Sequence, residues 1–179
     1  MRSIGVLACA IVASAAVRAM AAPAGYFELG PDVLLESGDT WSRNGVRYRL
    51  YGVQSCLRGT SFTNRYGRTE DCGEASLSVL AAFVKDTKPV CAPIVKSGSV
   101  TYVMCFASVA GKHLDLGMML ICEGYVFAAL DTAGMPVDPS YAVAEQQARV
   151  NQAGLWQFSG IQHPAIVLGR AAGRQGSRQ

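Results

Sequence analysis

Alternating apolar and polar residues predict a β-hairpin in the first third of the chain. The apolar residues of the run from 46 to 50 alternate with Arg47 and Arg49, which is the period of a strand with one face inward. Asn44-Gly45 precedes this run, and both residues tolerate the positive φ angles that a type I′ turn requires twice. Residues 37–56 are therefore expected to form a strand, a tight turn and a second strand, called here the central hairpin.

The remaining pattern alternates between strand-like and helix-like runs. Strands are expected at residues 33–36, 90–95 and 100–109, and helices at residues 73–85 and 114–123. Asp138-Pro139 begins a third helix as N-cap and first-turn residue, and its expected buried stripe consists of Tyr141, Ala144, Ala148 and Val150. This order of elements predicts the α+β class.

The two ends of the chain differ from its body. Residues 1–21 hold Arg2, an apolar run and Ala19-Met20-Ala21, which is the order of a secretory signal peptide. We therefore expect export to a bacterial periplasm or beyond, with an uncleaved anchor as the alternative and no transmembrane segment in the mature chain. Residues 22–31 are expected to be a lead-in, and residues 159–179 a disordered extension.

Five cysteines follow the predicted signal peptide, and an oxidising compartment favours disulfides among them. Cys56 and Cys72 bracket a long loop at residues 57–71, which a bridge would close. Cys91 and Cys105 can face each other across the hairpin of residues 90–109. Cys122 lies in an apolar helical run and is expected to be a buried free thiol.

No metal site is expected from the cysteines or histidines. The cysteine spacings do not match a zinc pair. His113 and His163 are the only histidines, and neither has a partner at ligand spacing, so each is expected to be structural.

The central hairpin resembles the staphylococcal-nuclease-like (thermonuclease) family, in which this run reads roughly DGDT, hairpin, RLxGIDxPE. Asp39 and Thr40 match the GDT, and Arg49 matches the first arginine. Later landmarks keep the family's order: Cys72-Gly73, GKHLDL, CEGYVFA, and a third helix with Tyr141, Glu145, Ala148, Arg149 and Gly154-Leu155-Trp156. The resemblance covers about residues 32–157. It implies a domain at residues 32–158 with a five-stranded OB-type β-barrel and three helices.

Most catalytic positions of that family are replaced in this chain. In the family, two aspartates hold calcium, a glutamate orients water and two arginines grip the phosphate. By this resemblance the first aspartate of DGDT falls on Ser37, the aspartate of the GIDxPE run on Gln54 and the glutamate on Leu57. The second arginine falls on Met104 or Val100, according to the alignment. Calcium prefers several charged oxygen ligands, and leucine cannot deprotonate water. Asp39 and Arg49 are therefore remnants of a catalytic set that is no longer intact.

Two classes of function remain open. The favoured one is a non-catalytic binding or assembly module, since OB barrels bind oligomers and peptides across one face; it needs no cofactor, and its partner is an unidentified protein or polyanion. The alternative is a weak or altered calcium-dependent phosphodiesterase acting on DNA or RNA, with acids supplied by Glu70, Asp71 or Glu74.

Charge is distributed unevenly along the chain. The formal net charge is +3, but residues 22–168 hold 11 basic and 13 acidic residues, a net charge of −2. Between Thr40 and Thr69 the sequence has no acid and six arginines: Arg43, Arg47, Arg49, Arg58, Arg65 and Arg68. A solvated face is one interpretation. The other is an anion-binding surface made of the last five, with weak nucleic-acid binding.

Overall fold

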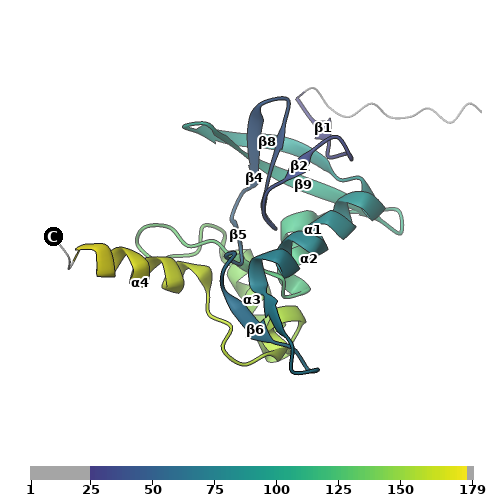
Figure 1. Cartoon of the computed structure of the whole chain (residues 1–179). Coiled ribbons are helices and arrows are strands. Elements are labelled where there is room, and N and C mark those ends of the chain that lie inside the picture. Colours follow the sequence, from purple (N-terminus) through teal and green to yellow (C-terminus); the bar gives the residue numbers. More distant parts are fainter. Residues whose placement is uncertain (1–24, 177–179) are drawn as a thin grey trace, which may run out of the picture.

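The computed structural model describes residues 25–176, which form a mixed α+β fold with a curled, half-barrel sheet (Figure 1). The sheet order is β1-β8-β9-β4-β3-β2, with β10 paired to β9. These strands are β1 (Phe27–Glu28), β2 (Leu34–Leu35), β3 (Thr40–Arg43), β4 (Val46–Leu50), β8 (Val90–Ser97), β9 (Val100–Val109) and β10 (Lys112–Asp115). Two smaller sheets pair β5 (Val53–Ser55) with β11 (Val126–Ala128), and β6 (Ser61–Thr63) with β7 (Thr69–Asp71).

The predicted central hairpin is present as β3 and β4. Asn44 has φ 51° and Gly45 has φ 76°, as a turn with two left-handed residues requires. On the strand before the turn, Trp41 pairs with Tyr48 of β4 and is fully buried. β4 then runs parallel to β9, so the hairpin forms the middle of the sheet.

Four α-helices occur among the described residues: α1 (Cys72–Thr87), α2 (Leu116–Cys122), α3 (Pro139–Val150) and α4 (Pro164–Gly176), and a 3-10 turn, η1 (Gly154–Gln157), follows α3. The first three each begin after an aspartate whose side chain accepts an amide hydrogen bond, namely Asp71, Asp115 and Asp138. Such caps satisfy amides that have no partner inside the helix.

The core fills the space between the sheet and helices α1, α2 and α3. Its largest fully buried side chains include Trp41, Leu80, Leu120 and Ile121. The Tyr141 hydroxyl donates to both carboxylate oxygens of Asp115, at 2.9 and 2.8 Å. Burial first, and then the Asp115 charge, raise the pKa of Tyr141. In α3 the predicted buried stripe holds except at Val150, which is 67 % exposed because the helix ends there.

Both predicted disulfides are present, one between Cys56 and Cys72 and the other between Cys91 and Cys105. Cys91 and Cys105 are direct partners in the register of β8 and β9. Cys122 is unpaired as predicted but exposed, so the prediction of a buried thiol is wrong. It is the last residue of α2, where it lies at the end of the apolar run rather than inside it.

Several sequence predictions differ from the fold. Segment 57–71 is a hairpin, β6–β7, and not an unstructured loop. Within the predicted disordered extension, residues 164–176 form α4. The described residues have seven strands in the main sheet and four α-helices, rather than five strands and three helices, and are consistent with an OB-like fold. The predicted signal peptide lies outside the described residues, none of whose helices is long and apolar enough to cross a membrane.

Candidate functional site

The Asp39 carboxylate lies at the centre of the predicted site and is almost fully buried, at 2 % exposure. Its Oδ1 accepts hydrogen bonds from the hydroxyls of Ser37, at 2.6 Å, and Thr40, at 2.8 Å. Its Oδ2 accepts from Nε of Arg49, at 3.0 Å, and from the amide of Ser55, at 3.1 Å. One carboxylate thus joins the turn before β3 to strands β4 and β5, and both of its oxygens are occupied.

Gly38 allows this arrangement to pack against α1. A Cβ at Gly38 would lie 2.6 Å from the Cβ of Ser76 and 2.8 Å from its backbone carbon, so no larger residue fits without a shift of α1. The Gly38 amide donates to Oγ of Ser55 at 3.1 Å. The Gly-Asp-Thr run therefore places Asp39 by close backbone packing.

Arg49 lies between the two oxygen-bearing side chains that the resemblance assigns to calcium. Its Nη2 is 2.9 Å from Oδ2 of Asp39 and donates to Oε1 of Gln54 at 3.0 Å. Because a guanidinium cation already contacts both oxygens, a second cation there would be repelled. No cluster of three or more His, Cys, Asp or Glu able to hold a metal occurs in the described residues. These residues do not fit a calcium ion.

A cleft of about 280 Å³ opens beside Arg49. We call it the Arg49 cleft; its lining residues include Arg49, Tyr51, Gln54, Val95 and Tyr102. The rings of Tyr51 and Tyr102 meet edge to face, with centroids 6.5 Å apart. Arg49 uses Nε and Nη2 in its internal bonds, and within the described part of the chain its Nη1 has no partner. The cleft therefore offers one cationic edge beside two phenol side chains.

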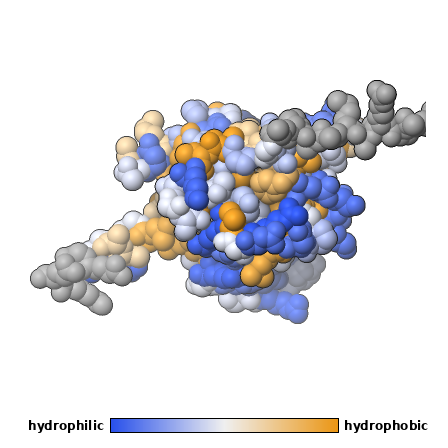
Figure 2. Space-filling model, turned by 90° about the horizontal axis from the view of Figure 1, so that it is seen from above, coloured by the Kyte–Doolittle hydropathy of each residue, from blue (hydrophilic) through white to orange (hydrophobic). Residues whose placement is uncertain are grey.

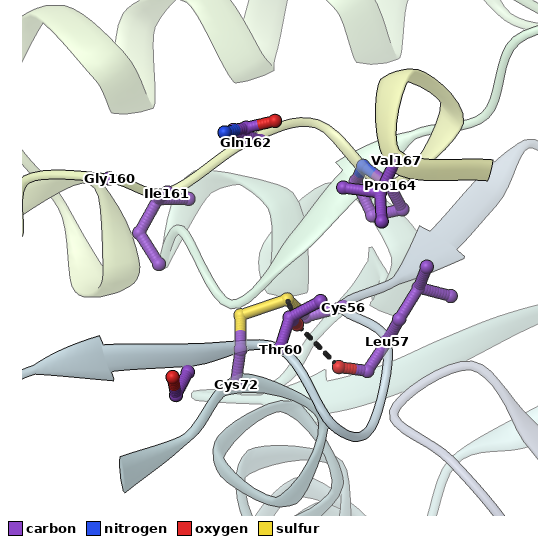
Figure 3. A pocket seen from close by; sticks show the side chains of 10 residues that line it. Cys56, Leu57, Thr60, Cys72, Gly160, Ile161, Gln162, Pro164 and Val167 are labelled. Carbon is purple, nitrogen blue, oxygen red and sulfur yellow. Dashed lines mark hydrogen bonds between the residues drawn. A yellow bond between two sulfur atoms is a disulfide. The ribbon is translucent and has the colours of Figure 1, made fainter. Parts of the chain in front are cut away.

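Leu57 belongs to a different pocket. This second pocket, of about 290 Å³, has the Cys56–Cys72 disulfide on one side and Ile161, Pro164 and Val167 on the other (Figure 3). We call it the disulfide pocket. Leu57 does not line the Arg49 cleft, whereas Gln54 does.

Four of the six arginines between Thr40 and Thr69 pair with carboxylates that lie outside that segment of the sequence. The pairs are Arg43 with Asp32, Arg47 with Glu36, Arg49 with Asp39, and Arg58 with Glu74. Arg65 and Arg68 lie instead near the tip of the β6–β7 hairpin, where the Arg65 guanidinium is 5.6 Å from the centroid of the Tyr66 ring. Three of the five predicted anion-binding arginines, Arg47, Arg49 and Arg58, therefore already have a carboxylate partner.

The acids considered for the phosphodiesterase alternative are all engaged elsewhere. Glu70 accepts from Nδ2 of Asn64, and Glu74 pairs with Arg58. Asp71 caps α1. Burial raises the pKa of Asp71, but amide hydrogen bonds and the charge of Arg58 outweigh burial, so the pKa is lowered. None of the three acids lines the Arg49 cleft.

A buried polar cluster between α3, β11 and the C-terminal segment has no counterpart in the predicted site. Oε2 of Glu145 accepts from the amide of Ala128 at 2.7 Å. The His163 Nδ1 accepts from the amide of Ala165, so its Nε2 carries the proton and donates to the Ala128 carbonyl at 3.0 Å. His163 thus has a structural position, and the sequence holds no spacing signal that would reveal its partners.

Compared with protein-family models and with curated proteins, the chain matches none. The thermonuclease resemblance therefore stays a prediction from the motifs of the sequence.

Proposed function

We propose that this protein is a non-catalytic binding module, built on a thermonuclease-like OB-type domain and exported from the cell. The observation that supports this most directly is the position of Arg49 between Asp39 and Gln54. A carboxylate whose oxygens already accept four hydrogen bonds is not free to bind a metal or activate water. The residues that perform catalysis in the family serve here to join β3, β4 and β5.

The Arg49 cleft is the proposed binding site, and an anionic group on a linear polymer is the proposed ligand. One edge of the guanidinium is free to bind an anion, and Tyr51 and Tyr102 can contact an adjoining planar or apolar part of the ligand. Other arginines are neutralised by carboxylates. Binding is therefore expected to be weak, because few cationic contacts are available. It is also expected to decrease with salt, since each phosphate contact releases counterions.

Titration of the mature protein with a labelled single-stranded oligonucleotide tests this proposal. Arg49→Gln is expected to raise the dissociation constant roughly ten- to a hundredfold, because a charged hydrogen bond is worth about 1.5–3 kcal/mol. Arg47→Gln is the matched control, since Arg47 lies two residues away on the same strand, pairs with Glu36 and does not line the cleft. Tyr102→Ala provides a second cleft variant that leaves the Asp39 bonds intact. No binding at low salt, or equal loss in the control, would contradict the proposal.

A cleavage assay tests the loss of catalysis. Mature protein is expected to leave single-stranded DNA intact in the presence of calcium, because Ser37, Gln54 and Leu57 supply no carboxylate. DNA degradation that is abolished by a chelator and again by Asp39→Ala would overturn this expectation and support the phosphodiesterase alternative.

A further inference from the structure

Helix α4 extends from the body of the protein as an arm. In Figure 1 it projects to one side, away from the sheet and from helices α1 to α3, and Figure 2 shows the same arm from above, with hydrophobic residues along it. All residues from 168 to 174 are exposed. Ile166 is 49 % exposed and Leu168 is 50 % exposed. An apolar part of this helix therefore lies in solvent.

Five apolar residues of α4 lie along one stripe, whereas Ile166 lies on the opposite side of the helix. Pro164, Val167, Leu168, Ala171 and Ala172 occupy positions i, i+3, i+4, i+7 and i+8, the spacing of an amphipathic helix face. Pro164 and Val167 line the disulfide pocket at the body end. The stripe is therefore covered at its start and uncovered from Leu168 onward.

The start of α4 is fixed by contacts with the body. His163 accepts the amide of Ala165 and donates to the carbonyl of Ala128 in β11. Arg170 donates to Oε1 of Gln162 at 2.7 Å. The arm is consequently held at a defined place on the molecule, and the apolar stripe is presented by a helix that already exists without a partner.

The positive charge of the C-terminal residues indicates the chemistry of the partner that the stripe would bind. Residues 146–179 contain no Asp or Glu, and the arm carries Arg170 and Arg174, with Arg178 beyond the described residues. The bond from Arg170 goes to an uncharged amide, so its charge is not neutralised there. The partner must therefore combine negative charge with an apolar layer beneath it.

We propose that α4 lies on the surface of a membrane that contains anionic phospholipids. Helices that dock in protein grooves use several large anchors at i, i+3 or i+4, and i+7. The exposed stripe has only Leu168 of that size, followed by two alanines. A lipid interface needs no matching groove and takes a cationic amphipathic helix through apolar burial and attraction to anionic headgroups. The arm thus attaches the domain to a membrane without crossing it.

Vesicle co-sedimentation with the full mature chain tests this. We expect binding to vesicles of phosphatidylcholine mixed with phosphatidylglycerol at low salt, much weaker binding at high salt, and little binding to phosphatidylcholine alone. Arg170→Gln is expected to weaken binding about fivefold, because it removes one arginine near an anionic surface. Leu168→Gln is expected to weaken it as well, because it removes the largest exposed apolar side chain of the stripe.

The matched control is Lys112→Gln, which removes one exposed positive charge from the main sheet. Its vesicle binding is expected to stay close to that of the unmodified protein. Equal loss in this control would show a general charge effect and overturn the proposal, as would equal binding to both kinds of vesicle or none to either. Self-association that Leu168→Gln abolishes, without vesicle binding, would assign the stripe to a second copy. These outcomes are independent of oligonucleotide binding in the Arg49 cleft.

Discussion

Asp39 joins three segments of the chain through a single buried carboxylate. Its partners are two hydroxyls, one amide and one guanidinium. A buried carboxylate is costly unless it is paired and hydrogen-bonded, and here each oxygen has two donors. Asp39 therefore has a structural role that needs no bound metal.

Asp39→Ala is expected to lower the free energy of unfolding by about 3–5 kcal/mol, because it leaves the Arg49 guanidinium and the Ser55 amide without their partner. Ser37→Ala is the control and is expected to cost about 1 kcal/mol, since it removes one hydrogen bond to an oxygen that keeps a second donor. Urea unfolding measures both. A loss below about 1 kcal/mol in Asp39→Ala would show that the cluster does not stabilise the fold.

Helix α1 shows at the level of one element how a single residue sets a boundary. Asp71 accepts the amide of Glu74 at 2.9 Å and the amide of Gly59 at 2.7 Å. It therefore caps α1 and also fixes the loop that the Cys56–Cys72 disulfide closes. This one side chain therefore connects the end of the β6–β7 hairpin to the start of α1.

Asp71→Ala is expected to lower the free energy of unfolding by about 1 kcal/mol, as loss of a helix cap usually does. Because the pKa of Asp71 is lowered in the folded state, its contribution is present above the unfolded pKa and is lost as the pH falls through the folded pKa. The difference between variant and unmodified protein is therefore expected to be full at neutral pH and to shrink below about pH 4. Urea unfolding at a series of pH values measures it; a difference that grows on acidification would contradict the assignment.

The C-terminal segment completes the whole molecule by returning to the core. His163 is 7 % exposed and its ring meets Phe127 edge to face, with centroids 5.3 Å apart. Beside it, Glu145 pairs with Arg149, whose guanidinium lies 4.2 Å from the centroid of the Trp156 ring. Residues 154–167 thus belong to the folded domain, and the free arm begins only beyond them.

His163→Ala is expected to lower the free energy of unfolding by about 1–3 kcal/mol, because the Ala128 carbonyl loses its buried donor. His163→Gln, which can donate to the same carbonyl, is expected to recover part of this loss. His113→Ala is the control, since His113 is exposed on β10. Hydrogen exchange of α4 amides should increase in His163→Ala; unchanged protection there would argue against an anchor at this residue.

Local pattern was sufficient for much of the fold. The turn at Asn44-Gly45, the aspartate caps, the hairpin that pairs Cys91 with Cys105, and the closure of segment 57–71 by Cys56 and Cys72 all follow from residues close in sequence, whose backbone preferences act without distant partners. Helix α4 was not predicted, because its glycines and arginines favour disorder by composition, whereas its start depends on contacts with β11.

The sequence by itself determined the α+β class, the central hairpin and both disulfides, since these are properties of residue type and short-range spacing. Only the tertiary structure decided which charges remain free. Acids distant in sequence neutralise Arg43, Arg47 and Arg58, and Leu57 lines the disulfide pocket together with Val167 rather than the Arg49 cleft. The physical reason is that electrostatic and packing partners are chosen by distance in space, which a linear pattern does not contain.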